Sequence, residues 1–253
     1  MNIILLSRKY YFLIYSLIII ICGSDLQLYA QSFPSISSET DRHNRVPFLL
    51  IIGSFFLDQT IHKIARENQS SALDKIADID RYYGDKYVTG GALLGLYGMG
   101  LLINDDNVKE TGEKAIIAAA VSGIVVVGLK EAFGRSRPYR GNGAWHFKPF
   151  SFEESRRSLP SGHAAVTFAI STVMANSVDN NYWKALWYGG AIGVGAARIY
   201  KNQHWFSDVI CGSVIGYFIA NKTEELFQNK KANPLFGLAF KDQAALLTVN
   251  YSF

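Results

Sequence analysis

Three short clusters between residues 130 and 208 combine side chains that could act on a phosphate group. Lys130 is followed seven positions later by an Arg–Pro pair, and a Pro–Ser–Gly–His run ends at His163. The third cluster places His204 and Asp208 four positions apart, which makes them neighbours on a helix. Cations gathered in one place repel one another unless an anion lies among them. Because guanidinium and backbone amide groups match the oxygens of a phosphate, the clusters indicate an oxyanion site.

The spacing within the clusters suggests a role for each histidine. Asp208 can hold one ring nitrogen of His204 and leave the other free to attack phosphorus. Ser161 and Gly162 form a turn that opens a helix, whose free amides would point at an anion. His163, just inside that helix, is placed to give a proton to the leaving oxygen.

Each cluster alone has an ordinary structural explanation, such as a solvated helix end, a surface ion pair or a common turn. From average residue usage, the chance of all three occurring in this order is below about one in a million. The combination therefore favours a functional site.

Together the motifs resemble the signature of the type 2 phosphatidic acid phosphatase superfamily: Lys-x6-Arg-Pro, Pro-Ser-Gly-His and Ser-Arg-x5-His-x3-Asp. The resemblance covers roughly residues 85–222. This superfamily also includes class A bacterial acid phosphatases and vanadium haloperoxidases. The resemblance implies a helical bundle that hydrolyses phosphomonoesters or pyrophosphates through a phosphohistidine, with no metal and no cofactor.

The resemblance also assigns residues. It implies catalytic roles for His204 as nucleophile, Asp208 as its partner and His163 as general acid. The residues that would hold the phosphoryl oxygens are Lys130, Arg137, Ser161, Gly162 and Arg198. One departure is visible, because Ala197 stands where the family usually has a serine. We expect this change to reduce or retune activity at most.

Two alternatives to a phosphatase stay open. A vanadium haloperoxidase would hold vanadate in the same pocket, with His204 as its ligand. A non-catalytic envelope protein with a vestigial pocket is the other, although both histidines and Asp208 are intact. The substrate is open as well, since phosphatidic acid, an isoprenoid pyrophosphate, the phosphates of lipid A and soluble phosphoesters all fit an oxyanion site.

The first 30 residues have the pattern of a secretory signal peptide. Arg8 and Lys9 precede a charge-free run from Tyr10 to Cys22, and Ala30 ends a small-residue cleavage site. An uncleaved anchor is the alternative. We expect an exported protein that is periplasmic or associated with a membrane of the cell envelope.

Composition narrows the set of partners. The net charge of +4 over 253 residues is compatible with anionic substrates or a membrane surface and gives no evidence for nucleic acid. If Cys22 leaves with the signal peptide, Cys211 has no partner, so neither a disulfide nor a cysteine metal site is expected.

The remaining chain is predicted to be one all-α domain over residues 46–230, a bundle of about six helices. It follows a lead-in segment over 31–45 and precedes an extended tail over 231–253. Apolar and helical patterns predict helices at 46–67, 88–104, 112–133, 163–178, 183–200 and 206–228, with a short helix and loop over 70–85. Alternation of apolar residues from Ala245 to Phe253 predicts a strand, with a hairpin turn at Lys241 and Asp242. That ending is similar to the last strand of outer-membrane barrels, so an outer-membrane location is one interpretation and an edge hairpin or packed tail is the other.

The loop over 134–159 is long for a bundle, and long loops are often functional. Its charged and aromatic members are Arg135, Arg140, Lys148, Arg156 and Arg157, with Tyr139, Trp145 and Phe147 between them. It is either a lid over the phosphate pocket or a solvated loop with aromatic residues packed beneath it. His146 is expected to be structural.

Membrane embedding is judged from the length of the charge-free stretches. The stretches over 88–104 and 115–129 are shorter than the roughly 20 residues that span a bilayer. We therefore favour a periplasmic bundle with peripheral membrane contact over an enzyme that crosses the membrane several times.

Overall fold

The computed structural model describes residues 39–232, 236–241 and 244–249. The expected signal peptide and residues 31–38 of the lead-in segment lie outside these ranges. The chain divides into two compact units, residues 1–48 and 49–253, and the helical core and the site both lie in the second.

The described residues form seven α-helices, which confirms the all-α fold class. They are α2 (Glu39–Glu67), α3 (Ser71–Ala77), α4 (Lys86–Leu102), α5 (Asp106–Phe133), α6 (Gly162–Asn176), α7 (Asn181–Tyr200) and α8 (Phe206–Ala232). Three short 3-10 helices lie between them: η1 (Asp78–Arg81), η2 (Pro138–Arg140) and η3 (Glu154–Arg156). Near the carboxy terminus, β1 (Phe236–Lys241) pairs antiparallel with β2 (Ala244–Val249), so that Phe236 lies opposite Val249.

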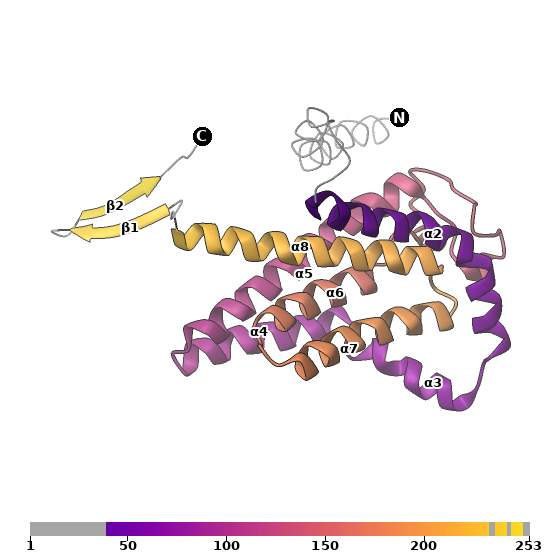
Figure 1. Cartoon of the computed structure of the whole chain (residues 1–253), viewed down its shortest axis with the longest axis horizontal. Coiled ribbons are helices and arrows are strands. Elements are labelled where there is room, and N and C mark those ends of the chain that lie inside the picture. The colour runs from indigo at the N-terminus through magenta and orange to yellow at the C-terminus, as the bar shows by residue number, and fades with distance from the viewer. Residues whose placement is uncertain (1–38, 233–235, 242–243, 250–253) are drawn as a thin grey trace, which may run out of the picture. The chain divides into compact units, whose positions relative to one another are not determined.

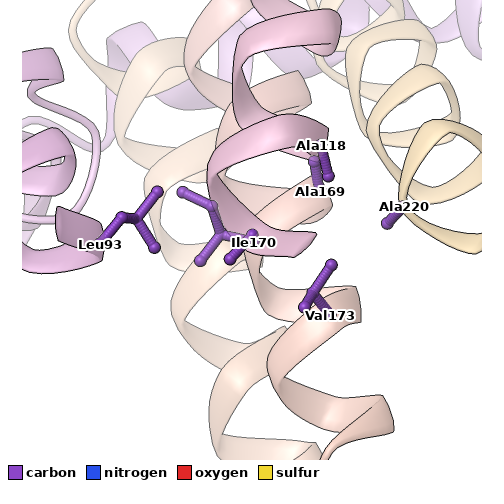
Figure 2. Close-up of a cluster of buried hydrophobic side chains, with 7 residues drawn as sticks. Leu93, Ala118, Ala169, Ile170, Val173 and Ala220 are labelled. Carbon is purple, nitrogen blue, oxygen red and sulfur yellow. The ribbon is translucent and has the colours of Figure 1, made fainter. Parts of the chain in front are cut away.

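Helix α6 is the centre of the bundle. It contacts α5, α7 and α8, while α4 packs against α5 (Figure 1). The core where these helices meet is built mostly of small and medium side chains, as Figure 2 shows for Ala118, Ala169, Ile170, Val173 and Ala220. Small residues allow helix backbones to approach closely.

At two glycines of α8, the backbone of α8 is in direct contact with the backbone of α6. A β-carbon placed on Gly216 would lie 2.1 Å from the backbone oxygen of Ala165 on α6. A β-carbon on Gly212 would lie 2.3 Å from the backbone oxygen of Ser161, at the start of the same helix. Because backbone atoms cannot turn aside as a flexible side chain can, these glycines fix how closely α8 packs on α6.

Polar caps set several helix boundaries. The Asp105 carboxylate accepts hydrogen bonds from the amides of Asn107 and Val108, so α5 begins at Asp106. The prediction of a start near Gly112 was therefore wrong, because it treated these polar residues as a turn and not as an N-cap. Helix α5 ends at Gly134, whose φ of 58° is left-handed and whose absent side chain leaves room for the Lys148 carbonyl. Helix α2 begins at Glu39, inside the expected lead-in segment.

Helix α5 is longer than expected, which bears on whether it could cross a membrane. Counting only charge-free residues made this segment look too short to span a bilayer. The whole helix has 28 residues and a window of mean hydropathy 2.0, of which 17% is buried. Among the described residues it is the one helix long and apolar enough to cross a membrane.

The packing of α8 on α6 can be tested by adding one methyl group. We expect Gly216→Ala to lower the free energy of unfolding by about 1–3 kcal/mol, because the new β-carbon overlaps the Ala165 carbonyl. The matched control is Gly189→Ala on α7, where a β-carbon meets nothing within 4 Å and alanine gains up to about 1 kcal/mol of helix propensity. Thermal or denaturant unfolding of the purified variants measures both, and equal stability would contradict the close approach.

Candidate active site

The structure brings the eight residues expected from the motifs to one end of the bundle. Lys130 lies in the last turn of α5 and Arg198 in the last turn of α7, while Asp208 lies in the first turn of α8. The Ser161 amide donates to the Asp208 carbonyl at 2.8 Å, which ties the start of α6 to the start of α8. The His204 amide donates to the Arg198 carbonyl at 3.3 Å.

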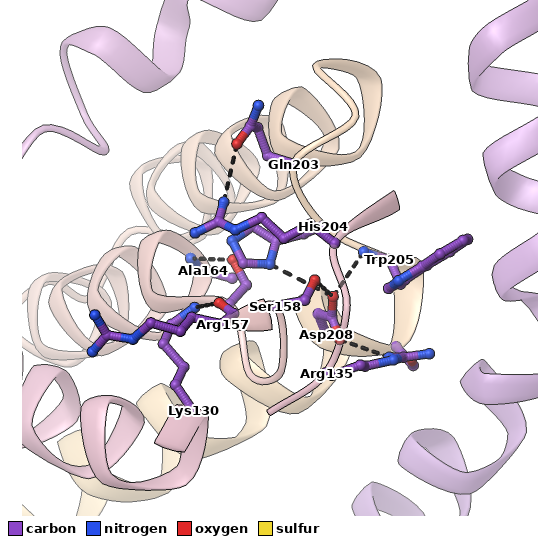
Figure 3. A network of polar contacts seen from close by, with 12 residues as sticks. Lys130, Arg135, Arg157, Ser158, Ala164, Gln203, His204, Trp205 and Asp208 are labelled. Atoms are coloured by element: carbon purple, nitrogen blue, oxygen red, sulfur yellow. Dashed lines mark hydrogen bonds and ion pairs between the residues drawn. The ribbon is translucent and has the colours of Figure 1, made fainter. Parts of the chain in front are cut away.

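His204 and Asp208 have the arrangement expected of a nucleophile and its orienting carboxylate. His204 is 2% exposed, and its Nδ1 lies 3.6 Å from Asp208 Oδ2, slightly longer than a hydrogen bond (Figure 3). That oxygen also accepts the Trp205 amide at 2.8 Å and the Ser158 hydroxyl. The Trp205 contact is one half of a capping box at the start of α8, because the side chain of the third helical residue accepts from the amide that precedes the helix.

The three cations approach the pocket from three different segments. Arg137, which precedes η2, donates to Gln203 Oε1 at 3.0 Å and pairs with Glu154. Lys130 donates from α5 to the carbonyl of Arg157. Arg198 donates through one terminal nitrogen to Asp80 at 3.0 Å, while its buried Nε has no hydrogen-bond partner among the described residues. A buried donor without a partner is available to bind an oxyanion.

The amino terminus of α6 holds Ser161 and Gly162, the remaining two residues expected to bind the oxyanion. Ser161 is the N-cap, fully buried, and its hydroxyl accepts from the Ala164 amide. A β-carbon on Gly162 would lie 3.9 Å from Lys130 Cε, so the start of this helix faces the same space as the lysine. Free amides at a helix amino terminus favour bound anions.

The electrostatics of the site keep the histidines neutral and the carboxylate ionised. Burial lowers the pKa of His204 well below 6.5. Burial and then the charge of Arg198 lower the pKa of His163 to about 4. Burial alone would raise the pKa of Asp208, but the interaction with His204 and the charge of Arg135 outweigh it and lower the pKa to about 2. A neutral His204 beside an ionised Asp208 is the state that nucleophilic attack requires.

Several residues at the site were missed by the sequence argument. Asp80 on η1 binds both Arg198 and Lys201, the latter at 2.6 Å. Ser158 binds Asp208, and Asp58 on α2 reaches the same region through Arg135. No spacing rule relates Asp58 or Asp80 to the motifs, because each lies more than 70 residues away in sequence from the residue it contacts.

The loop over 134–159, expected to be either a lid over the pocket or a solvated loop, has both buried and exposed side chains. Arg135 is fully buried, so this charged member of the loop is not solvated. The other arginines of the loop form ion pairs: Arg140 and Arg156 with Glu153, and Arg157 with Glu131 and Glu154. Trp145 is 62% exposed while its ring lies 5.6 Å from that of Phe55. His146 bonds Ser136 at 3.0 Å, which agrees with a structural role.

An apolar groove of about 510 Å³ begins one helical turn from the site. Val127 lies three residues before Lys130, Val166 lies three residues after His163, and both line the groove. The remaining lining residues come from α4 and α5: Lys86, Thr89, Gly90, Leu93, Ala119, Ala120, Gly123 and Ile124. Such a volume falls within the roughly 300–1,000 Å³ typical of ligand pockets.

No group of three or more His, Cys, Asp or Glu side chains in the described part of the chain is arranged to hold a metal ion. The cations of Lys130, Arg137 and Arg198 lie around the two imidazoles, and Asp80 and Asp208 offset part of their charge. These groups suit an anionic guest.

A helical bundle with a cationic pocket at one end suits a protein that handles phosphate groups, and comparison with known proteins shows which proteins the chain is similar to. The PAP2 superfamily model matches residues 114–231. The crystal structure of Aquifex aeolicus LpxE superimposes with a TM-score of 0.54 and 25% identity, covering 67% of this chain and 95% of that one. A transmembrane PAP2 type phosphatidylglycerolphosphate phosphatase from Bacillus subtilis superimposes with a TM-score of 0.56 and 19% identity, covering 72% of this chain and 94% of that one.

A sequence relative points to the same family. The chain is 34% identical over 107 residues to a lipid A 1-phosphatase of Porphyromonas gingivalis, a match that covers 42% of this chain and 21% of the relative. The chain thus spans about a fifth of the length of that relative. The family model, the structural neighbours and this relative therefore agree that the chain is similar to members of the PAP2 superfamily.

The role of Asp80 can be tested through oxyanion affinity. Removing its charge frees the Arg198 guanidinium from a charge-assisted hydrogen bond of the kind worth about 1.5–3 kcal/mol. We therefore expect Asp80→Asn to raise the dissociation constant of orthovanadate roughly tenfold. Asp78→Asn is the matched control, because Asp78 pairs with Lys201 at 3.0 Å and makes no described contact with Arg198. Equal effects of the two variants would show that Arg198 does not depend on Asp80.

Proposed function

We propose that this chain is a phosphatase that removes phosphate from a lipid, with His204 as the nucleophile. The observation that carries the proposal is the buried His204 ring, which has Asp208 behind one nitrogen and the charges of Lys130 and Arg137 around it. These charged groups come together from segments far apart in sequence. Apolar residues in the same place would stabilise the fold better, so the cluster is not explained by stability. A phosphoryl group supplies the negative charge that the pocket lacks.

The proposed reaction has two steps. The free ring nitrogen of His204 attacks phosphorus, the bond to the leaving oxygen breaks, and His163 gives that oxygen a proton. Water then attacks the phosphohistidine with His163 as base, which returns both histidines to their starting states. Lys130, Arg137 and Arg198, together with Ser161 and the Gly162 amide, stabilise the charge of the phosphoryl oxygens in both steps. Preorganised charge of this kind is the main source of catalysis in phosphoryl transfer, so the scheme uses no metal ion.

Two observations support a lipid as the substrate. The apolar groove starts one turn from Lys130 and His163, so a phosphate in the pocket would place an attached apolar chain at its mouth. The relative from Porphyromonas gingivalis is a lipid A 1-phosphatase, and the Bacillus subtilis neighbour is a phosphatidylglycerolphosphate phosphatase. We infer that the enzyme works at a membrane of the cell envelope. A phosphate-release panel that compares lipid A, phosphatidic acid, an isoprenoid pyrophosphate and a soluble ester tests the substrate class directly.

Substitution of the two histidines tests the mechanism. We expect His204→Ala to abolish turnover, because no other described group replaces the attacking nitrogen. His163→Ala should lower kcat by about 10²–10⁴-fold for poor leaving groups and much less for good ones, which need no protonation. Phosphate release from alkyl and nitrophenyl phosphates measures both effects. A His204→Ala variant with the wild-type rate would rule out the proposed nucleophile.

The low pKa of His163 predicts different pH profiles for the free and the substrate-bound enzyme. In the empty site its pKa is about 4, and a general acid must be protonated to act. A bound phosphate adds negative charge, which raises that pKa by about 1–3 units. We therefore expect the descending limb of kcat to lie at higher pH than the descending limb of kcat/KM. Steady-state rates between pH 4 and 9 test this, and in His163→Ala the limb in kcat should disappear.

Filling the groove should separate lipid from soluble substrates. Gly123 lines the groove, and a β-carbon there meets nothing within 4 Å, so Gly123→Leu can be accommodated without disturbing the core. We expect roughly a tenfold loss of kcat/KM for a long-chain lipid phosphate and no loss for p-nitrophenyl phosphate. Gly95→Leu on α4 is the matched control, because Gly95 is equally open and does not line the groove. Equal losses on both substrates would place the lipid chain elsewhere.

A further inference from the structure

Arg135 is the most completely bonded charged side chain in the described part of the protein. It is fully buried, and each of its five N–H donors has an acceptor. Nη1 donates to Asp208 Oδ1 and to Ser207 Oγ, both at 2.6 Å. Nη2 donates to Asp58 Oδ2 at 2.6 Å and to the Ala144 carbonyl at 2.7 Å, and Nε donates to the same carbonyl at 2.9 Å.

The two oxygens of Asp208 are therefore divided between two tasks. Oδ1 is held by Arg135, whereas Oδ2 faces His204 and also accepts from Trp205 and Ser158. In Figure 3 the carboxylate lies between the imidazole and the guanidinium. Fixing one oxygen prevents the carboxylate from rotating, so the other stays directed at His204.

Asp58 holds the opposite side of the guanidinium. It lies on α2, is 1% exposed and also accepts the Ser207 amide at 2.8 Å and the Ser207 hydroxyl at 2.7 Å. Asp58 therefore binds the first turn of α8 as well as Arg135. This carboxylate belongs to none of the three motifs and lies outside residues 114–231, which the family model matches.

Aromatic rings complete the enclosure. The guanidinium carbon of Arg135 lies 4.8 Å from the ring centre of Phe55, 5.4 Å from that of Phe147 and 5.7 Å from that of Trp205. These contacts keep water away, and a buried ion pair gains little stability over apolar residues of the same volume. A purely structural role for three charges at this place is therefore poorly supported.

We propose that Arg135 and Asp58 are positioning residues for catalysis, which hold the Asp208 carboxylate so that Oδ2 orients His204. The inference rests on the proposed function of His204 as the nucleophile. It assigns to α2 a part in the reaction, although no residue of that helix is expected to touch the substrate.

The first test replaces Arg135 and follows catalysis, binding and the ionisation of His204 separately. Arg135→Met keeps the length of the side chain and removes its charge. We expect kcat to fall roughly 10–100-fold, as for other groups that orient a reacting residue, while KM and the orthovanadate constant stay within about twofold. Loss of a positive charge beside Asp208 should also raise the pKa of His204, which ¹⁵N-histidine NMR measures once His204→Gln has assigned the signal. Arg135→Lys should recover part of kcat and keep the pKa of His204 low.

The second test removes the charge at Asp58. Asp58→Asn retains a single acceptor oxygen where two now bind Ser207 and Arg135, so the guanidinium loses part of its support. We expect kcat to fall roughly tenfold at unchanged KM. Because a negative charge has been removed, the pKa of His204 should not rise. The pKa of His204 should thus rise in Arg135→Met and not in Asp58→Asn. A general loosening of the fold would not separate the two variants in this way. This variant decides the question if Arg135→Met does not fold, and a wild-type kcat would then overturn the proposal.

The control is a second buried cation that is far from Asp208. Lys114 on α5 is 8% exposed and pairs with Glu110 and Glu224 at 2.7 Å. Lys114→Met should lower stability and leave kcat and the His204 pKa unchanged. The positioning role is overturned if Arg135→Met leaves the His204 pKa unchanged, or if its KM and vanadate constant rise as much as kcat falls.

Failure of the proposed function gives a different result. In that case the wild-type chain releases no phosphate from any substrate of the panel. The His204 titration then decides the positioning inference alone: a raised pKa in Arg135→Met supports it, and an unchanged one overturns it.

Discussion

The Asp208 carboxylate is the constraint on which the rest of the site depends. It caps the start of α8 through Trp205, binds Ser158 of the preceding loop, faces His204 and pairs with Arg135. Its backbone carbonyl also accepts the amide of Ser161 at the start of α6. One residue therefore fixes the geometry of segments that carry the proposed nucleophile and part of the phosphate site. Because it is fully buried, water cannot replace any of these contacts.

Charge balance explains why carboxylates surround a pocket that is proposed to bind an anion. An empty site that collected Lys130, Arg137 and Arg198 without compensation would repel itself and cost stability. Glu154 pairs with Arg137 and Asp80 pairs with Arg198, and each of these contacts uses only part of the guanidinium. The cations are thus held in place before a ligand arrives, and such preorganisation lowers the cost of binding and of charge development during the reaction.

The close packing of helix backbones also helps to position the residues of the site. Gly212 and Gly216 let α8 lie directly against α6, so the helices that carry Asp208 and His163 in their first turns share one close interface. Gly134 ends α5 at the point where the chain must turn toward Arg135 and Arg137. Reacting groups on rigid helix ends keep their geometry better than groups on free loops do.

The sequence by itself determined the fold class, most helix positions and all the motif residues that meet at the pocket. This was possible because histidine, arginine and a Pro–Ser–Gly turn rarely occur together at fixed spacing by chance, and because apolar periodicity marks long helices. It failed at the start of α5, where the polar residues before residue 112 include an N-cap, and it gave no sign that Arg135 is buried.

Only the tertiary structure decided which groups support the motif residues. Asp58 and Asp80 are aspartates of no distinctive spacing, and their roles arise from contacts with residues more than 70 positions away. The direction of each Asp208 oxygen and the groove beside the pocket depend likewise on how helices pack. Short-range spacing fixes which residues share a helix face, but long-range burial fixes which charges meet, and that follows from the packing of the whole core.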